Sequence, residues 1–259
     1  MRRSGFMALV LLSGALTFPA LHSATAGTPT AQSGFSDSEE RRIETIVREY
    51  LLKHPEVIVE AMQELDKKQA SADKLRQDKA IAANRAAIYD DADSFVAGNP
   101  KGDVTIVEFF DYQCGYCKHS FEPLMDTVKN DGNIRLILKE FPILSPESAT
   151  ASRAAIASMR QGKYLEFHKA LFHHKGALTD DEIMRVASSV GLDTALLKRD
   201  MADPKIGAIL KRNYELADAL GVKGTPGFIV GGKLIPGALE KDEFAAVVKE
   251  ARETCGANC

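Results

Sequence analysis

The chain has 259 residues, of which 45% are hydrophobic and 27% charged, so it has the apolar side chains for a core and matches neither a disordered nor a membrane-embedded protein. Its 33 basic and 36 acidic side chains give a net charge of −3, and we therefore expect no nucleic acid or anionic membrane as partner. Four cysteines are too few for a disulfide scaffold, which leaves a soluble protein with one main domain and a smaller part.

The first 26 residues have the pattern of a secretory signal peptide. Two arginines precede an apolar run from Phe6 to Leu16, and the small residues Ala24 and Ala26 mark a cleavage site. The run is too short to cross a bilayer, which takes about 20 apolar residues. We expect cleavage after about Ala26 and export to a compartment where disulfides persist, with an uncleaved membrane anchor as the alternative.

Helical patterns fill residues 36–89, after a flexible lead-in over residues 27–35. Ser36 and Glu39 have the spacing of a capping box at the start of a helix. Apolar side chains then recur at helical spacing in two runs: Ile43, Ile46, Val47, Tyr50 and Leu51, then Ile58, Ala61, Met62 and Leu65. Residues 66–79 carry few apolar side chains, which predicts a solvated helical spacer.

The apolar stripe in this segment predicts self-association. Such a stripe must be covered, and a long polar spacer separates it from the remainder of the chain, so we expect a second copy of the chain to cover it. Folding back onto the chain's own main domain is the alternative. No heptad pattern continues for three or four repeats, so a coiled coil is not established.

An α/β pattern extends over residues 90–252. A short strand is expected near 94–96, and residues 104–110 are rich in β-branched and aromatic side chains. Apolar residues keep helical spacing over 121–128, and residues 134–138 alternate as a strand. This β-α-β order implies that the two longer strands pair in parallel.

A helical stretch over about 145–220 interrupts this pattern before the β signal returns. Its clearest helix is expected to begin at Thr179 and to end at Gly191. Residues 227–235 predict a tight hairpin, followed by a final helix and a tail over 253–259. The sequence thus predicts an α/β domain with a helical insertion, preceded by an N-terminal helical extension.

The strongest chemical signal is Cys114-Gly115-Tyr116-Cys117, where a predicted strand gives way to a helix. Unpaired N–H groups and the helix dipole at a helix N-terminus stabilise a thiolate, which lowers the thiol pKa and raises its reactivity. The spacing brings the second cysteine within reach of the first. We therefore predict that Cys114 attacks disulfides and that Cys117 resolves the mixed disulfide.

Other interpretations of this motif are weaker. A zinc site needs a second ligand pair, and the remaining cysteines, Cys255 and Cys259, lie at the tail. Haem attachment needs a histidine directly after the second cysteine, where Lys118 stands. A purely structural disulfide does not explain the strand–helix junction. We interpret the histidines of one predicted helical stretch as surface residues: His168, His173 and His174. We therefore predict no metal site, and we predict no cofactor.

Two other features fit redox chemistry. Glu108 lies in an apolar run, so its carboxylate should be partly buried with a raised pKa, and it is a candidate carrier of the proton of Cys117. Strand alternation is equally consistent with a Glu108 that faces solvent. Thr225-Pro226 stands between two glycines just before a strand, although spacing alone does not predict a cis bond there.

Together these features resemble the thioredoxin fold of the DsbA family, over about residues 94–252. The segments most specific to that family are residues 109–118, FFDYQCGYCK, and residues 139–144, KEFPIL. The N-terminal helices are similar to the ScsC-like branch, the suppressor-of-copper-sensitivity proteins, which oligomerise through such a segment.

The resemblance implies roles for several residues. Pro226 is expected to be cis, and Thr225 to offer its backbone to a substrate strand beside the first cysteine. Gly115 and Tyr116, inside the motif, are expected to contact the substrate as well. Glu108 occupies the position of the family's buried acid.

Within the family, the motif departs from that of the strongest oxidant, which has Pro-His between its cysteines. Gly115-Tyr116, with threonine before the proline, is similar to the dimeric disulfide isomerase of the bacterial periplasm. A less stabilised thiolate makes a weaker oxidant. The resemblance therefore favours an isomerase or reductase over a dedicated oxidase.

The sequence as a whole predicts an exported, periplasmic thiol–disulfide oxidoreductase with a Cys114–Cys117 disulfide in its oxidised form. Its expected partners are cysteine-containing client proteins, a membrane redox partner and further copies of itself, as a dimer or trimer formed through residues 36–89. The alternative is an oligomeric copper-binding protein that uses the same two thiols as soft ligands.

Overall fold

The structure is a computed structural model that describes residues 34–255. The predicted signal peptide, nearly all of the lead-in, Cys259 and the side chain of Cys255 lie outside the described part. The chain divides into two compact units, residues 1–63 and residues 64–259. Within residues 34–255, no helix is both long and apolar enough to span a bilayer.

The first unit contains α1 (Asp37–Lys53) and the start of α2 (Glu56–Ala83). Ser36 and Glu39 form the predicted capping box, which fixes the start of α1. The apolar stripe is exposed: Ile46 is 58%, Tyr50 53% and Met62 60% accessible. This helical pair therefore buries little of its own apolar surface.

The second unit is built on a five-stranded sheet in the order β1-β3-β2-β4-β5. The strands are β1 (Phe95–Gly98), β2 (Val104–Phe110), β3 (Ile134–Glu140), β4 (Gly227–Val230) and β5 (Lys233–Pro236). The central pair, β2 and β3, is parallel and is joined by α4 (Gly115–Asp131), which confirms the predicted β-α-β unit. The other pairs are antiparallel.

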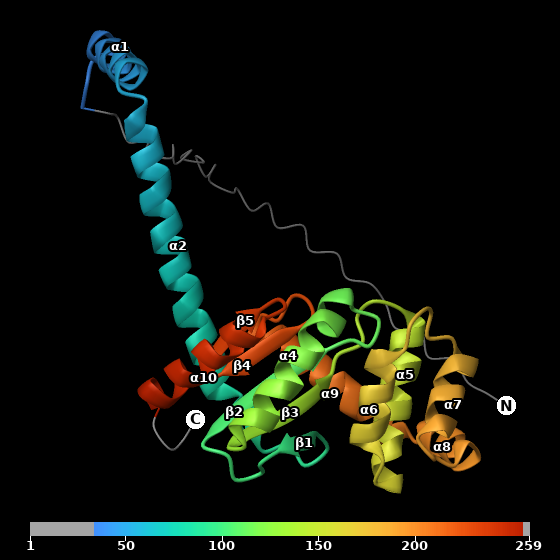
Figure 1. Ribbon diagram of the computed structural model, residues 1–259. Coiled ribbons are helices and arrows are strands. Elements are labelled where there is room, and N and C mark those ends of the chain that lie inside the picture. The colour runs from blue at the N-terminus through green and yellow to red at the C-terminus, as the bar shows by residue number, and fades with distance from the viewer. Residues whose placement is uncertain (1–33, 256–259) are drawn as a thin grey trace, which may run out of the picture. The chain divides into compact units, whose positions relative to one another are not determined.

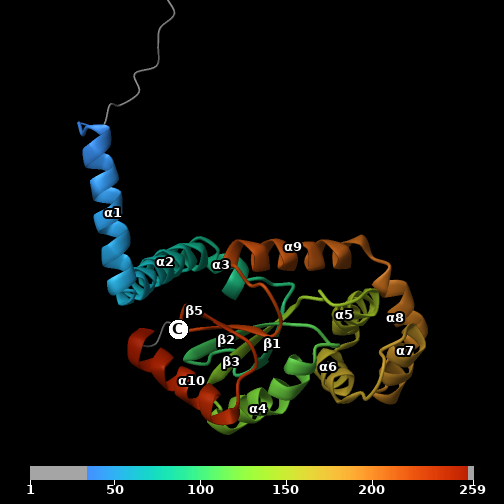
Figure 2. The ribbon, with the colours of Figure 1, turned by 90° about the horizontal axis from the view of Figure 1, so that it is seen from above.

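Helices cover both faces of this sheet, as Figure 2 shows from above. Even-numbered residues of the central strands, such as Phe110 and Leu138, pack in the core shared with α4 and α10 (Lys241–Cys255). Odd-numbered residues, such as Phe109, pack in a second core with α3 (Arg85–Tyr89) and α9 (Pro204–Leu220). Strand alternation therefore decides which core each side chain enters.

The second core also includes residues that the sequence placed in the spacer. Ile81 at the end of α2, and Ile88 and Tyr89 of α3, are buried beside the sheet. Leu75, by contrast, is 55% exposed. Packing of the second unit thus begins near residue 80, where the polar pattern ends.

The helical insertion lies at one end of the second unit, next to α9 (Figure 1). It consists of α5 (Pro146–Ser158), a short 3-10 turn over Met159–Gln161, α6 (Tyr164–His173), α7 (Asp180–Ser189) and α8 (Thr194–Met201). Thr179 caps α7 as predicted, because its hydroxyl accepts a hydrogen bond from the Glu182 N–H. The α/β architecture with its insertion and its preceding helices is therefore confirmed.

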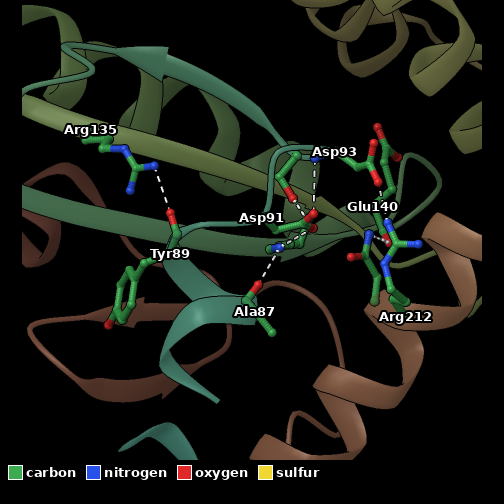
Figure 3. Close-up of polar contacts among 10 residues, drawn as sticks. Ala87, Tyr89, Asp91, Asp93, Arg135, Glu140 and Arg212 are labelled. Atoms are coloured by element: carbon green, nitrogen blue, oxygen red, sulfur yellow. Dashed lines mark hydrogen bonds and ion pairs between the residues drawn. The ribbon is translucent and has the colours of Figure 1, made fainter.

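Cations from β3 hold the end of α3 against the sheet (Figure 3). The Lys139 Nζ donates to the carbonyl of Ala87 and to the carboxylate of Asp91, each at 2.8 Å. Arg135 donates to the carbonyl of Tyr89 at 2.8 Å. Lys139 has no exposed surface, so its charge depends on these partners.

Candidate active site

Cys114 is the N-cap residue of α4, where the strand-to-helix turn places it. Its sulfur accepts a hydrogen bond from the Cys117 N–H at 3.3 Å, and its thiol donates to the Thr225 carbonyl at 3.2 Å. Only 6% of the residue is exposed. The helix N-terminus therefore supplies the anion-stabilising N–H group that the sequence predicts.

The two cysteines have opposite acidities. The Cys117 thiol, more than any other group, lowers the pKa of Cys114 to about 6, and backbone N–H groups act in the same direction. Burial raises the pKa of Cys117 far above its usual range. At neutral pH this arrangement favours a Cys114 thiolate beside a protonated Cys117 thiol.

The structure describes the dithiol form of this site, because Cys114 and Cys117 are both free thiols. The Cys114–Cys117 disulfide stays a prediction for the oxidised form.

Thr225 and Pro226 lie next to Cys114, at the start of β4. The Thr225-Pro226 peptide bond is cis, Pro226 is buried and the Thr225 carbonyl is the one that accepts from Cys114. A groove of about 480 Å³ opens beside them, with apolar lining from Val222, Leu234 and Pro236. The groove is therefore lined in part by Thr225, the residue whose carbonyl is bonded to the Cys114 sulfur.

Glu108 lies on β2 and is 1% exposed, which excludes the solvent-facing alternative. Burial, followed by the charges of Cys114 and Glu140, raises its pKa to about 8. Its Oε2 has no hydrogen-bond partner in the described structure. A carboxyl group with this pKa is able to donate or accept a proton near neutral pH.

Exposed apolar side chains occur in the motif and in the loop before α5. Tyr116 is 72% exposed, and Ile143 and Leu144 are 40% and 53% exposed. The Leu144 N–H donates to the Asp111 carboxylate at 2.9 Å, which ties their loop to the turn before Cys114. Gly115 is exposed, and a Cβ built there would meet no atom within 4 Å.

Sequence reasoning missed three buried polar residues beside the motif: Asp111, Tyr112 and Glu140. Asp111 shapes the turn, since its carboxylate also accepts from the Gln113 N–H and the Ser148 hydroxyl. All three lie in the two segments that are most specific to the family, residues 109–118 and 139–144. Their place in these segments is the sequence signal that could have identified them.

The interpretation of His168 as a surface residue is wrong. It is completely buried, and burial lowers its pKa to about 3. The cause is its place on the inner side of α6, where its ring packs against Phe110, Tyr112 and Phe172. His173 is exposed and pairs with Glu122 at 2.6 Å. Among the residues described, no group of three or more His, Cys, Asp or Glu side chains is arranged to hold a metal ion.

Two family models match the chain. The model described as DSBA-like thioredoxin domain matches residues 105–249, more than half of the chain. The model described as Copper resistance protein ScsC N-terminal domain matches residues 39–72. The matches therefore cover both the sheet-containing unit and the N-terminal helices.

Solved structures of similar proteins agree with these matches. A thioredoxin-like oxidoreductase from Silicibacter pomeroyi DSS-3 is 42% identical, with a TM-score of 0.65, over 66% of this chain and 99% of that one. Proteus mirabilis ScsC in a transitional conformation is 30% identical, with a TM-score of 0.62, over 84% of this chain and 98% of that one.

Curated relatives share only part of their length with this chain. The Na(+)/H(+) antiporter NhaA 1 of Salinispora arenicola is 28% identical over 158 residues, which is 60% of this chain and 24% of the antiporter. The chain thus spans about a quarter of the curated relatives that it matches.

Proposed function

Because the chain belongs to the DSBA-like thioredoxin family and has an ScsC-type N-terminal segment, we propose that it is an exported thiol–disulfide oxidoreductase of the periplasm. The observation that carries this proposal is the pairing of an acidic thiol at a helix N-cap, Cys114, with a buried, protonated thiol at Cys117. Such a pair is suited to thiol–disulfide exchange with cysteines of client proteins.

The proposed cycle moves two electrons between a client and the dithiol. The Cys114 thiolate attacks a client disulfide, which breaks as one client sulfur leaves and the other joins Cys114. Cys117 then gives its proton to Glu108 and attacks the Cys114 sulfur, so that the client leaves as a dithiol and the protein keeps the disulfide. A membrane redox partner restores the starting state, and the reverse sequence oxidises a client.

Cys114→Ser tests the chemistry. We expect it to abolish insulin reduction and the refolding of scrambled ribonuclease, because no thiolate is left to attack. Cys117→Ser is the matched variant, which keeps the attacking thiol and is expected to accumulate mixed disulfides. Full activity of Cys114→Ser would exclude the proposal.

We further propose that clients bind along the groove beside Thr225 and Pro226, with Gly115 and Tyr116 on the other side of the sulfur. Gly224 lines that groove, and a larger side chain at this position should block it. A Cβ there would meet no atom within 4 Å, and its backbone is not left-handed, so a larger side chain should not disturb the fold. Gly224→Leu should slow turnover of protein clients and leave the reaction with a small aromatic disulfide unchanged; equal effects on both would exclude the groove.

Isomerase or reductase activity fits this site better than dedicated oxidation. The groups that lower the pKa of Cys114 are thiol, hydroxyl and backbone groups, with no cation among them. Tyr116, inside the motif, is largely exposed. The redox state in cells, read by thiol alkylation and gel shift, tests this preference: a mostly reduced pair supports it, and a mostly oxidised pair points to an oxidase.

Self-association through residues 36–89 is proposed from the exposed stripe on α1 and α2. Deletion of residues 27–63 is the sharper test, because Ile81, Ile88 and Tyr89 belong to the second unit's core. Light scattering should give a dimer or trimer for the mature chain and a monomer for the deletion. An unchanged monomeric mass for both would exclude self-association.

Cu(I) binding by the two thiols is the second candidate function. It is favoured by the copper-resistance family model that matches residues 39–72, and thiolates are soft ligands that suit Cu(I). Turnover discriminates between the two functions. A binding protein has no catalytic rate on a disulfide substrate, whereas an oxidoreductase cycles.

A further inference from the structure

A buried polar cluster around Glu140 lies on the same side of the sheet as the dithiol and has no part in the proposed cycle. The Oε1 atom of Glu140 accepts hydrogen bonds from the hydroxyls of Tyr112 and Tyr164, at 2.9 and 2.7 Å. Its Oε2 atom accepts from the Ser152 hydroxyl at 2.7 Å. Tyr112 also contacts the Nδ1 atom of His168 at 3.0 Å. Hydrogen bonds therefore surround a carboxyl group that is 2% exposed.

Glu140 and Glu108 lie on the same face of the central strand pair. In the parallel register, Phe110 pairs with Glu140 and Glu108 pairs with Leu138. Side chains two residues apart on a strand point to the same face, and Phe110 and Leu138 both belong to the core that includes the two cysteines. The two carboxyl groups are therefore diagonal neighbours on the face that bears the cysteines, and Glu108 is the one that acts on the sulfurs.

The two carboxyl groups differ in their hydrogen bonds. Three hydroxyl groups stabilise a negative charge on Glu140, whereas the Oε2 of Glu108 has no partner. Burial raises the pKa of both carboxyl groups to about 8, but at Glu140 the three hydroxyl donors act against this rise. Neighbouring buried carboxylates do not readily both ionise, so Glu140, which has the donors, takes the charge first as the pH rises. The other is then left protonated.

We infer that Glu140 is a positioning residue that carries the single negative charge of this pair and so keeps the proton on Glu108. This inference rests on the proposed role of Glu108 as the proton carrier of Cys117. The charge next to Glu108 makes its carboxylate a stronger base when it ionises, and leaves it protonated for the reverse step.

The groups around the pair leave this charge unbalanced. His168 is neutral at working pH because burial holds its pKa near 3. Opposite Glu108 on β4 stands Phe228, which does not titrate. The other titratable groups that act on the pair are neutral or acidic: Asp111 and Tyr112 in the turn, Cys114 and Cys117 on α4, and Tyr164 on α6. The cation Lys169, which acts on His168, is exposed to solvent.

Glu140→Gln tests the inference, because its side-chain carbonyl still accepts hydrogen bonds while the charge is removed. The measurement is the single-turnover attack of Cys117 on a mixed disulfide formed at Cys114 with dithiobis(nitrobenzoic acid). That reagent is the oxidant, and release of its second thiolate reports the step. The rate of the unaltered protein should rise with pH as Glu108 ionises. The midpoint should lie below the pKa of about 8 that Glu108 has in the dithiol form, because the Cys114 charge that helps to raise this pKa is absent from the mixed disulfide.

For Glu140→Gln we expect the midpoint of this pH profile to fall by about one pH unit, the size of one nearby charge in a partly polar interior. Glu108→Gln should slow the step and remove the inflection, and adding Glu140→Gln to it should cause no further shift. An unchanged midpoint in folded Glu140→Gln, or the same shift without Glu108, would overturn the inference. An inflection retained in Glu108→Gln would instead overturn the proposed proton carrier.

Ser152→Ala provides a second test in case Glu140→Gln does not fold. It removes the hydroxyl that donates to Oε2, so the negative charge on Glu140 is less stabilised. We expect the midpoint of the pH profile to fall by less than in Glu140→Gln. Ser158→Ala is the matched control, since this buried serine of the same helix donates to the Ala155 carbonyl and not to Glu140. Equal pH profiles for the two serine variants would contradict the inference.

Discussion

The two faces of the central strand pair bury charge in different ways. On the α9 face, Lys139 is fully buried and bonded to Asp91 and to a carbonyl of α3. On the α4 face, Glu108 and Glu140 are buried with no Lys or Arg partner in the described part of the chain. One face uses a paired charge to anchor a helix, and the other keeps carboxyl groups whose protons exchange near neutral pH.

Breaking the anchoring pair should have the largest effect on stability. Lys139→Met removes the cation from the Asp91 carboxylate, which is 18% exposed and keeps its hydrogen bonds from Asp93 and Ser94, and removes the donor to the Ala87 carbonyl. Loss of one partner of a buried pair costs about 3–5 kcal/mol. We expect a loss near the lower end in the free energy of unfolding, measured by urea denaturation. Lys211→Met, at a lysine 76% exposed, is the matched control and should change it by less than about 0.5 kcal/mol.

Removing the acid Glu108 on the opposite face should raise the free energy of unfolding instead of lowering it. The Glu108 pKa is raised from 4.5 to about 8, so the stability that its protonated form provides is complete below pH 4.5 and is lost as pH rises toward 8. Glu108→Gln should therefore raise the free energy of unfolding of the reduced protein by about 1–3 kcal/mol at pH 7.

This gain should disappear when the same denaturation is measured at pH 4.5. A gain of equal size at both pH values would show that the ionisation of Glu108 does not cause the difference in stability.

Cys117→Ala tests how strongly the Cys117 thiol lowers the pKa of Cys114. The Cys117 thiol is the main group that lowers the pKa of Cys114 to about 6, so its loss should raise that pKa by about one unit. Alkylation of Cys114 by iodoacetamide at pH 6 should then slow roughly fivefold. Cys117→Ser keeps a hydroxyl donor and should slow it less; an identical alkylation profile for all three proteins would contradict this account of the pKa.

The smallest effect is expected at the second anchor of α3. Arg135→Ala removes the hydrogen bond to the Tyr89 carbonyl, and one such bond to a charged donor contributes about 1.5–3 kcal/mol. Because Arg135 is only half-buried, the free energy of unfolding should fall by about 1.5 kcal/mol, less than for Lys139→Met. A loss larger than that of Lys139→Met would reverse the ranking of the two anchors.

The sequence was sufficient where the signal is local. The capping residues Ser36 and Thr179, the hairpin after Gly227 and the position of Cys114 at the start of α4 depend on neighbours within a few residues. Local spacing also indicates the burial of His168. This residue lies four positions from both Tyr164 and Phe172, on the buried side of α6.

Features that arise only in the folded chain were not predictable from the sequence. The cluster at Glu140 joins hydroxyls from a turn and two helices, which are brought together by the helical insertion. The burial of Glu108 could not be decided from strand alternation, since every residue of β2 is buried. The packing of Ile81 and Ile88 against the sheet depends on the position of α9.

The proposed chemistry is tested most directly by trapping a client on Cys117→Ser. With the resolving thiol removed, the reduced variant is mixed with a disulfide-containing client and the products are mapped by mass spectrometry after acid quenching. Our account predicts an accumulating disulfide between the client and Cys114. A correctly folded variant that forms no adduct, or one joined to the client through a different cysteine, would contradict it.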